Sequence, residues 1–438
     1  MKTKNVLVIG SGGREASLVW KLLQSPQAGK IYAAPGNPGM QMNGCQTIPI
    51  APTAENFPML CLIASHLEID LVVVGPDNCI AEGIEFHFRK AGIPVFSPSR
   101  EAAQIEWSKV YAKELMKDIG IPTANFTVFR EAVHARNGCQ YIALPLVVKE
   151  DGLGLGKGAR VCRTESEARQ AIDDFMVKKI HGKAGEKILI ENFLEGKELS
   201  IHVLCDGIPE HAIILPPVRD HKQLTADPDS PMTGGMGVFG PIDVSAKLME
   251  TIRNTIILPV LRELSGRGTP FVGLLYPGLM LTEKGPMVLE FNARWGDPEC
   301  QWYMRHLHES VDLIEVLSAC TEGRLDKIEL QWNDTYGMVV TLATPGYPDN
   351  PKKNLHVWGR TYLRDYCPDD VIIFHAGTYW SNGEIITSGG RIFSVSTEWA
   401  RKYGPTHRRK DLYELIQHPV CGVGSFEGMQ YRTDIGQV

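Results

Sequence analysis

The sequence lacks the features that mark secreted, membrane-spanning or nucleic-acid-binding proteins. Its 438 residues include ten cysteines, but none stands in a Cys-x-x-Cys pair, so we expect neither a disulfide framework nor a zinc site. No apolar stretch approaches the ~20 residues that a membrane span needs, and the run Val6–Ile9 is too short for a signal peptide. No basic run is long enough to hold nucleic acid, and the formal net charge is −6. These absences predict a cytoplasmic protein without nucleic-acid or membrane partners.

The composition is that of a globular protein with more than one domain. Hydrophobic residues make up 43% of the chain and charged residues 22%, which suits a buried core under a charged surface. The length predicts roughly two to four domains. The changes of pattern described below divide the chain into residues 1–102, 103–328 and 329–438.

The first hundred residues alternate short β-branched runs with helical segments. This alternation is typical of an α/β fold in which helices wind over both faces of a parallel sheet. Ligands of such sheets bind at the carboxyl ends of the strands. Strands are expected at Asn5–Ile9, Lys30–Ala34, Asp70–Val74 and Ile93–Phe96, and helices at residues 53–67, with Thr53 as N-cap, and 80–91.

Three glycine-bearing loops follow the first three strands: Gly10–Arg14, Pro35–Asn37 and Gly75–Asp77. The first loop matches the dinucleotide-binding G-x-G-x-x-G pattern only in part, because Glu15 stands at the sixth position and no acidic residue ends the second strand. Free N–H groups at a helix N-terminus, together with Arg14, would still seat a phosphate. The alternative is that these glycines serve only a tight turn.

A glycine-rich segment, residues 151–158, lies between the predicted strands Leu144–Lys149 and Ala159–Cys162. It is not a P-loop, because the spacing from Gly152 to Lys157 is one residue short and a strand follows where a helix should. A lysine at a strand end followed by a glycine hairpin favours a flexible flap that carries Lys157 over phosphates. A surface hairpin with glycines in its turn is the alternative.

Groups suited to a nucleoside follow the next predicted strand, Lys187–Asn192. Glu191 and the main chain around Leu194 could bond an adenine edge, and Glu198 could hold ribose hydroxyls. Glutamates at strand ends are common, so a purely structural role stays open.

Two further elements of the middle region are predicted from pattern alone. Residues 199–204 form a strand with His202 as an interior sheet residue. Residues 245–264 form a helix with Ser245 as N-cap and a kink at Pro259.

The candidate metal site lies on a predicted hairpin of the strands Phe271–Thr282 and Pro286–Asn292. Strand alternation puts Val288, Glu290 and Asn292 on one side, and Met287, Leu289 and Phe291 toward a core. A carboxylate and an amide oxygen two residues apart suit Mg²⁺, which takes few protein ligands beside substrate phosphates. Arg294 follows as a planar cation for a carboxylate or phosphate. An edge strand with solvated polar residues is the alternative.

The last hundred residues predict a small α+β unit. Its strands are Tyr336–Thr344, followed by a hairpin of residues 371–380 and 385–396 around Ser381–Gly383, and Thr397 caps a helix. For Gly389-Gly390-Arg391 two interpretations stay open: the segment reaches a cleft, or it is a plain turn.

In order along the chain, these motifs resemble those of the glycinamide ribonucleotide synthetase family of the ATP-grasp superfamily. The match covers nearly the whole chain and includes VLVIGSGGRE, DLVVVGP, VVKEDGLGLGKG, ENFLEGKELS, TGGMG and LEFNARWGDPECQ. The resemblance implies an N-terminal doubly wound pre-ATP-grasp domain, an ATP-grasp domain with a small mobile subdomain at residues 122–193, and a C-terminal α+β domain. It also implies an ATP-dependent carbon–nitrogen ligase of purine biosynthesis that joins glycine to phosphoribosylamine through a glycyl phosphate. Its cofactors would be ATP with Mg²⁺ or Mn²⁺, and its state a monomer or weak homodimer.

The resemblance also implies roles for single residues. The catalytic residues would be Arg294, Lys149, Lys157 and Asp220. The ATP-binding residues would be Lys109, Lys149, Gly154, Gly156, Lys157, Gly158, Glu191, Phe193, Leu194 and Glu198. The residues for the other substrates would be Gly12, Gly13, Arg14, Glu15, Asn37, Gly75, Pro76, Asp77, Asp220, Lys222, Gly235, Arg294, Gly296 and Asp297. The metal ligands would be Glu290 and Asn292.

Several positions depart from the family pattern, and most are expected on the substrate side. They are Ala16-Ser17, Ser97, Gln223, residues 226–232 and Trp295. Two alternative functions therefore stay open. One is a diverged ligase with another amine or amino acid, and the other is a nucleotide-binding protein without catalysis.

Overall fold

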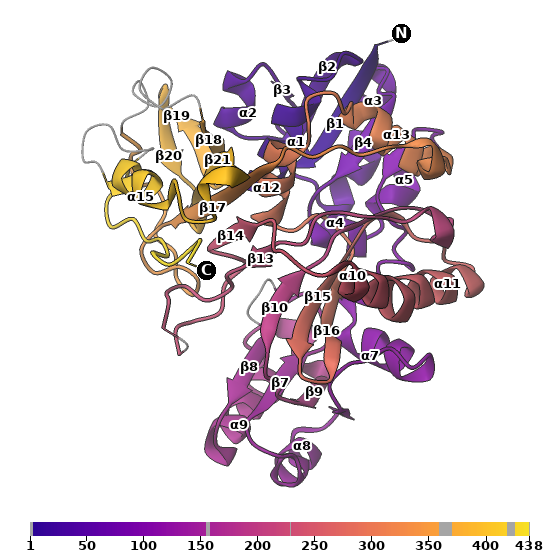
Figure 1. Ribbon diagram of the computed structural model, residues 1–438, viewed down its shortest axis with the longest axis vertical. Helices are drawn as coiled ribbons and strands as arrows, with labels where there is room; N and C mark the ends of the chain where they lie inside the picture. The colour runs from indigo at the N-terminus through magenta and orange to yellow at the C-terminus, as the bar shows by residue number, and fades with distance from the viewer. Residues whose placement is uncertain (1–2, 155–157, 228, 359–369, 418–424, 438) are drawn as a thin grey trace.

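The computed structural model describes residues 3–154, 158–227, 229–358, 370–417 and 425–437. Within these ranges, strands form three five-stranded sheets, one four-stranded sheet and a two-stranded hairpin (Figure 1). The predicted flap residues Gly156 and Lys157 lie outside the described residues. No described helix is both long and apolar enough to cross a membrane.

The N-terminal sheet is parallel, as predicted, with strand order β3-β2-β1-β4-β5. Alternate residues of β1 enter two different cores: Leu7 and Ile9 pack in one, Val6 and Val8 in the other. Both faces of the sheet are therefore buried, which is why Val6–Ile9 and Leu71–Val74 in its central strands are apolar at every position. The strands are β1 (Lys4–Gly10), β2 (Ala28–Pro35), β3 (Gln46–Thr47), β4 (Leu71–Val74) and β5 (Val95–Phe96).

Two helix predictions in this region are corrected. Thr53 makes no side-chain cap bond, since a 3₁₀ turn, Ala54–Asn56, precedes the α-helix. The helix predicted over residues 80–91 is broken by Gly83, whose φ is +80°, a value that only glycine adopts readily. The helices are α1 (Gly13–Leu22), α2 (Pro38–Met42), α3 (Phe57–His66), α4 (Asp77–Ala81) and α5 (Ile84–Lys90).

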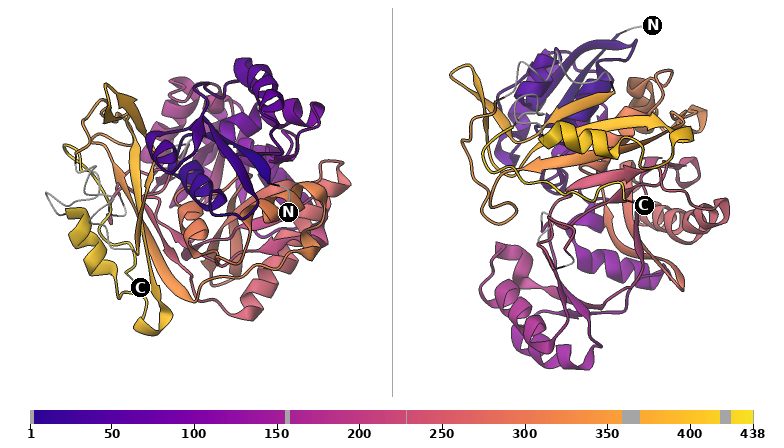
Figure 2. Two further views of the ribbon diagram at one scale, coloured as in Figure 1. Left: turned by 90° about the horizontal axis from the view of Figure 1, so that it is seen from above. Right: turned by 60° about the vertical axis from the view of Figure 1, so that its left-hand side comes forward.

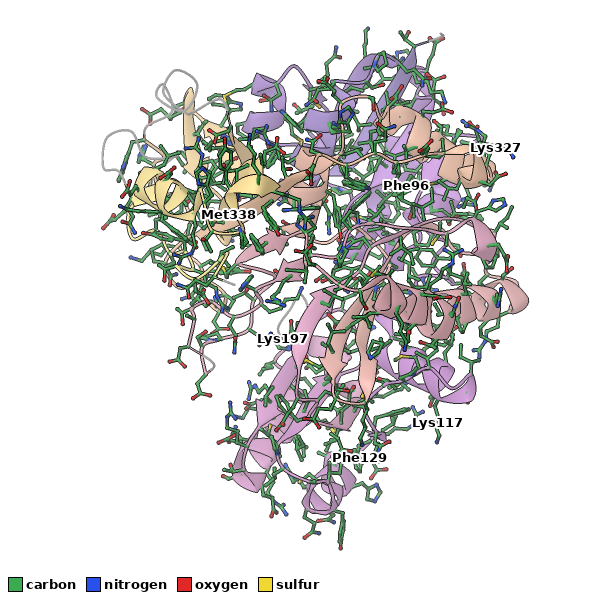
Figure 3. All side chains as sticks on the ribbon, viewed as in Figure 1. Phe96, Lys117, Phe129, Lys197, Lys327 and Met338 are labelled. Carbon is green, nitrogen blue, oxygen red and sulfur yellow. The ribbon has the colours of Figure 1, made fainter. Side chains whose placement is uncertain are left out.

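A small lobe follows, at the bottom of Figure 1 and in the right view of Figure 2. Its antiparallel sheet has the order β6-β9-β7-β8 and packs with α8 and α9 around a separate core. Figure 3 labels Phe129 in this lobe and Lys197, at the start of β10, above it. The elements are β6 (Phe126–Phe129), α8 (Ala132–Gly138), β7 (Leu146–Glu150), β8 (Ala159–Cys162), α9 (Glu165–Ile172) and β9 (Ile188–Asn192).

The central sheet has the order β10-β15-β11-β12, with β16 paired to β15. Some of the helices that cover this sheet precede the small lobe in the sequence, and others follow it. Its strands are β10 (Lys197–Ser200), β11 (Val203–Asp206), β12 (Ile213–Ile214), β15 (Val272–Thr282) and β16 (Gly285–Asn292). The central helices are α6 (Gln104–Trp107), α7 (Lys109–Asp118), α10 (Ala246–Ile252), α11 (Leu258–Gly266), α12 (Glu299–His306) and α13 (Leu313–Glu322).

Three central predictions are resolved by the structure. His202 is not inside a strand, because β10 ends at Ser200 and β11 begins at Val203. Ser245 does cap its helix, accepting a bond from the N–H of Leu248 at 3.2 Å. A π-helical segment, Arg253–Ile257, separates α10 from α11 next to Pro259.

The last sheet joins the middle of the chain to its end, with the order β13-β14-β17-β21-β18. Asn382-Gly383 turns the hairpin of β19 and β20, as predicted, but the predicted strands are each broken in two. Thr397 lies within β21 and caps no helix. The elements are β13 (Arg219–Asp220), β14 (Gly237–Gly240), β17 (Thr335–Ala343), β18 (Val371–His375), β19 (Thr378–Ser381), β20 (Glu384–Thr387), β21 (Arg391–Ala400) and α15 (Arg409–Gln417).

Two buried histidines make the fold sensitive to acid. Burial lowers the pKa of His306 and of His375 from 6.5 to about 4 in each case. Below pH 6.5 the unfolded chain binds protons that the folded chain does not bind until about pH 4. The free energy of unfolding therefore falls as the pH drops through this window, and each histidine contributes no such change above it.

We expect His306→Phe to flatten this acid dependence. Phenylalanine can keep the stack on Trp302, whose ring centroid lies 3.9 Å from that of His306, but it cannot take up a proton. The decrease in the free energy of unfolding between pH 7.5 and pH 5 should be smaller by about 2 kcal/mol, as measured by urea unfolding at the two pH values. The exposed His134→Phe is the control, and an equal acid dependence in His306→Phe and the unaltered protein would contradict the assignment.

Candidate functional site

One cavity of about 530 Å³ opens where the small lobe, the central sheet and the ends of the other two sheets meet. Most of the predicted site residues that the structure describes line it. They are Arg14, Asp77, Lys109, Lys149, Gly154, Gly158, Glu191, Phe193, Leu194, Glu198, Lys222, Glu290, Asn292, Arg294 and Asp297. The structure thus brings together residues that stand almost three hundred positions apart in the sequence.

One end of the cavity combines an apolar wall with a buried charge cluster. Met116, Val147 and Leu289 belong to the wall. Glu191 is 2% exposed, and its Oε2 lies 3.0 Å from the Nζ of both Lys113 and Lys149. Burial alone would raise the pKa of Glu191, but these two lysines hold it below its usual value. An apolar wall beside fixed lysines suits a nucleoside joined to phosphates.

Lys149 and Lys109 project from different elements into this end. Lys149 is the next-to-last residue of β7 and donates to the carbonyl of Leu289 at 3.2 Å. Lys109 begins α7, and its Nζ donates to the carbonyl of Gly152 at 2.7 Å, which ties the helix to the glycine-rich segment. Ser108 caps α7 by accepting from the N–H of Tyr111 at 3.2 Å.

Glu290 and Asn292 line the middle of the cavity, on β16. Burial alone would raise the pKa of the Glu290 carboxyl, but Lys109, Lys222 and Lys149 hold it below its usual value, so it is ionised at neutral pH. Asn292 Oδ1 accepts from Arg294 Nη2 at 3.1 Å and keeps a second lone pair. An ionised carboxylate beside an amide oxygen fits a hard divalent cation such as Mg²⁺.

The strand itself differs from the prediction. Val288 is fully buried in the core, whereas Leu289 lines the cavity next to Glu290. The cause is a bulge: Gly278 pairs with Glu290 and the next residue, Leu279, pairs with Val288. The extra residue shifts the alternation of faces within the strand. The two candidate metal ligands, Glu290 and Asn292, nevertheless both line the cavity.

Arg294 lies at the junction between the two ends of the cavity. Its Nη2 is 3.0 Å from Glu106 Oε1 and 3.9 Å from Asp77 Oδ2. Its buried Nε has no hydrogen-bond partner among the described residues. The guanidinium is therefore fixed by carboxylates while one donor stays available to a bound anion.

The far end of the cavity gathers groups from all three parts of the chain. Arg14 Nη1 donates to the carbonyl of Trp295 at 3.1 Å. Arg391 Nη2 donates to Asp297 Oδ2 at 2.9 Å, and Gln301 Nε2 donates to Asp297 Oδ1 at 2.7 Å. Tyr347 completes the lining. The segment Gly389-Gly390-Arg391 thus reaches the cavity through Arg391 and is not a plain turn.

Several predicted substrate residues lie behind this end instead of lining it: Gly12, Gly13, Glu15, Asn37, Gly75, Pro76, Asp220, Gly235 and Gly296. Glu15 is 2% exposed and accepts from the N–H of Gly12 and from Arg14 Nε, both at 2.6 Å. The N–H of Gly12 is therefore not free for a phosphate. A side chain at Gly75 would place its Cβ 1.9 Å from Glu15 Oε1, so that glycine makes room for the carboxylate.

Asp220 and Asn37 support neighbouring loops. Burial raises the pKa of Asp220 to about 7, and its Oδ2 lies 2.5 Å from Lys222 Nζ, which does line the cavity. Asn37 Nδ2 donates to the carbonyls of Ser11 and His375, both at 2.9 Å. These contacts link the N-terminal loop to the end of β18.

Sequence reasoning gave no site role to several polar residues that line or shape the site, among them Glu106, Lys113, Gln301 and Tyr347, and it named Arg391 only as an open alternative. None belongs to a local pattern of ligand residues. Their contacts are long-range, as in the 2.7 Å bond from the N–H of Ala293 to Glu106 Oε2. His202 was also misassigned, since its Nε2 accepts from the N–H of Gly296 at 3.1 Å and holds the turn after Arg294.

Three sequence profiles match the chain. They describe the N domain of phosphoribosylglycinamide synthetase (residues 4–106), its ATP-grasp (A) domain (residues 107–300) and its C domain (residues 337–438). The central match makes the chain an ATP-grasp protein. It belongs to the phosphoribosylglycinamide synthetase family, as full-length relatives also show.

One such relative is the phosphoribosylamine–glycine ligase of Caldanaerobacter subterraneus subsp. tengcongensis. It is 37% identical over 98% of this chain and 99% of its own length. The bifunctional purine biosynthetic protein of Pichia angusta is 39% identical over 99% of this chain, which spans about half of that longer protein (54%).

Among solved structures, the phosphoribosylamine–glycine ligase of Thermotoga maritima has a TM-score of 0.79 at 29% identity. It covers 98% of this chain and 100% of its own. The biotin carboxylase of Campylobacter jejuni has a TM-score of 0.71 at 15% identity, covering 99% of this chain and 94% of its own. The second likeness concerns the fold alone.

Proposed function

We propose that the chain is an ATP-dependent ligase that joins glycine to 5-phosphoribosylamine and releases glycinamide ribonucleotide, ADP and phosphate. The observation that carries this proposal is the single cavity with two chemically different ends. A nucleotide-type end with buried lysines meets an arginine- and carboxylate-rich end at Glu290, Asn292 and Arg294. The full-length relatives named as phosphoribosylamine–glycine ligases support the same substrates.

The reaction consists of two transfers. A glycine carboxylate oxygen attacks the γ-phosphorus of ATP, and ADP leaves. The amine nitrogen then attacks the carbonyl carbon of the glycyl phosphate, phosphate leaves, and the nitrogen gives up a proton to form the amide. No protein nucleophile is needed, so the side chains act by orienting and by offsetting charge.

The proposed roles follow from position. Lys109 and Lys149 hold the ATP phosphates, and Glu191, Phe193, Leu194 and Glu198 hold the nucleoside, beside Gly154 and Gly158. Arg294 orients the acyl phosphate at the junction. Glu290 and Asn292 would hold Mg²⁺ or Mn²⁺, which offsets charge on the transferring phosphoryl group when bound. The described residues hold no cluster of three or more His, Cys, Asp or Glu suited to a metal, so the proposed cation would take two protein ligands and otherwise substrate oxygens.

The remaining proposals concern organisation. We propose the domain limits 1–102, 103–328 and 329–438, a subdomain at residues 122–193 that moves, and substrate contacts near Gly12, Gly13, Pro76 and Asp220. We also propose that the protein acts in the cytoplasm as a monomer or weak homodimer, without nucleic-acid or membrane partners.

The departures from the family pattern lie mostly outside the cavity. Ala16 packs in a core, Ser97 is 1% exposed and Trp295 is 2% exposed. Of the altered positions, Met232 is the one found in the lining. This distribution supports the family substrates over a diverged amine or amino acid.

A screen of ADP release tests the proposed substrates. The purified protein is assayed with ATP, Mg²⁺ and each amino acid, with and without phosphoribosylamine generated in situ. We expect release that requires both glycine and phosphoribosylamine. Release with another amine would support the diverged ligase, and binding of ATP without any release would support a protein that has lost catalysis.

A separate prediction assigns Arg14 to the amine substrate. Arg14→Ala should raise the Michaelis constant for phosphoribosylamine by about ten- to a hundredfold, the value of a hydrogen bond to a charged group. The constant for ATP should stay within about twofold, because Arg14 lines the far end of the cavity. Arg89→Ala, which removes a half-exposed arginine of α5 that pairs with Glu85 and does not line the cavity, is the control. Loss of ATP affinity in Arg14→Ala would place the nucleotide at this end and overturn the arrangement.

A further inference from the structure

Arg391 bonds two loops of the central region through both of its terminal nitrogens. Besides Asp297 Oδ2, it reaches three main-chain carbonyls through Nη1: those of Asp297 at 2.6 Å, Gly234 at 3.0 Å and Gly235 at 3.3 Å. The guanidinium therefore ties the 233–235 turn to the turn at Asp297. Its own strand, β21, comes from the end of the chain.

Tyr347 holds the same turn from the other side. Its hydroxyl accepts from the N–H of Gly234 at 3.2 Å, while Arg391 occupies the carbonyl of that residue. Gly234 is thus fixed at both of its polar backbone groups by the C-terminal part of the chain. Both side chains line the cavity.

The turn has little room to move sideways. Gly235 has φ +120°, and a Cβ there would lie 2.7 Å from Pro298 Cδ and 2.8 Å from the carbonyl oxygen of Asp297. The two turns are in close contact, so a small displacement of one moves the other. Asp297 also has its second oxygen held by Gln301.

All of these contacts lie at the far end of the cavity. The nucleotide-type end is built by Lys109, Lys149 and Glu191, none of which contacts Arg391 or Tyr347 in a described bond or ion pair. Sheet order explains the placement, because β13 and β14, which flank the 233–235 turn, pair into the same sheet as β17 and β21.

We propose that Arg391 and Tyr347 are positioning residues that fix the 233–235 turn and Asp297 for the amine substrate and not for ATP. The inference rests on the proposed function, since it divides the cavity between those two substrates. It assigns the C-terminal part of the chain a direct share in building the acceptor end.

The test compares Tyr347→Phe, Arg391→Lys and Arg391→Ala. Phenylalanine removes one acceptor oxygen, so the Michaelis constant for the amine should rise about three- to tenfold; either arginine change should raise it about ten- to a hundredfold. ATP affinity, measured by calorimetry, should stay within about twofold. The control is Arg401→Ala, which removes the arginine that directly follows β21 and pairs with Asp243, away from the cavity.

Energetic coupling between Arg391 and Asp297 gives a measurement that a purely structural role of Arg391 would not change. Asp297→Asn should already lose much of what Arg391 provides, so Arg391→Lys should cost less in that background than alone. If Arg391→Ala does not fold, Tyr347→Phe and Arg391→Lys carry the test.

The inference would be overturned if folded Tyr347→Phe and Arg391→Lys kept the Michaelis constant for the amine unchanged. It would also be overturned if the changes weakened ATP binding and amine binding equally. Failure of the proposed function is seen separately, as absence of amide product from the unaltered protein. If another amine is the substrate, the same ratio of amine to ATP effects is measured with that amine.

Discussion

Glu290→Ala should lower magnesium-dependent turnover by about a hundred- to a thousandfold, the loss found when one group that stabilises transferring charge is removed. Glu290 is ionised in the middle of the cavity, and Lys109, Lys222 and Lys149 all act on its pKa. Removing the carboxylate takes away the stronger of the two candidate metal ligands. The fold should persist, because no described hydrogen bond or ion pair depends on this side chain.

Three measurements separate the causes. Turnover is measured by ADP release, metal affinity by titration of Mn²⁺ in the presence of ADP, and folding by the melting temperature. Glu290→Gln keeps the shape and removes the charge, so it should also bind Mn²⁺ weakly. Glu283→Ala, at the exposed turn of the same hairpin, is the control. Normal turnover in folded Glu290→Ala would remove Glu290 from the site.

Arg294→Lys should lower turnover by about a hundredfold while ATP affinity stays within about twofold. Lysine keeps the positive charge that Glu106 and Asp77 require, but it lacks the planar fork. The guanidinium lies between Asn292 and Glu106, at 3.1 and 3.0 Å, with Nε still available. A lysine cannot hold both neighbours and an acyl phosphate in one geometry.

The variant should also leak the intermediate. If Arg294 orients the acyl phosphate, its loss should release ADP without equal amounts of amide, because water then competes with the amine. The ratio of ADP to amide is measured on the same sample. Arg305→Lys is a matched control. Arg305 lies on α12, is largely buried, and its Nε is 3.2 Å from Glu398 Oε1. A ratio of one in Arg294→Lys, with normal turnover, would contradict the assigned role.

Local patterns predicted the strand-and-helix skeleton well because they depend on near neighbours. Val6–Ile9 of β1 and Leu71–Val74 of β4 are apolar at every position, since both sheet faces are buried. The Asn-Gly turn and the caps at Ser108 and Ser245 are equally local. Where neighbours from elsewhere intervene, prediction failed: the bulge in β16 is set by its pairing with β15, and the break at His202 by contact with Gly296.

The residues of the candidate site also fall into those that a local motif predicts and those that it does not. Lys149, Glu290 and Arg294 stand in motifs whose residue types already indicate phosphate and metal chemistry. Arg391 and Tyr347 do not, because their importance comes from a sheet that pairs β14 with β17 across a hundred residues. Glu15 shows the opposite error. It stands in a strong motif and was predicted to contact substrate, but its side chain is buried beneath the loop. Sequence order alone does not say which polar side chain of a glycine loop faces the ligand.

The central claim is that one cavity couples ATP cleavage to amide formation between glycine and phosphoribosylamine. The most direct measurement is mass spectrometry of the product formed from ¹³C-labelled glycine, ATP, Mg²⁺ and phosphoribosylamine generated in situ, with ADP measured in parallel. We predict labelled glycinamide ribonucleotide and ADP in equal amounts, both lost when glycine or the amine is left out. ADP formed with no labelled glycinamide ribonucleotide would contradict the account.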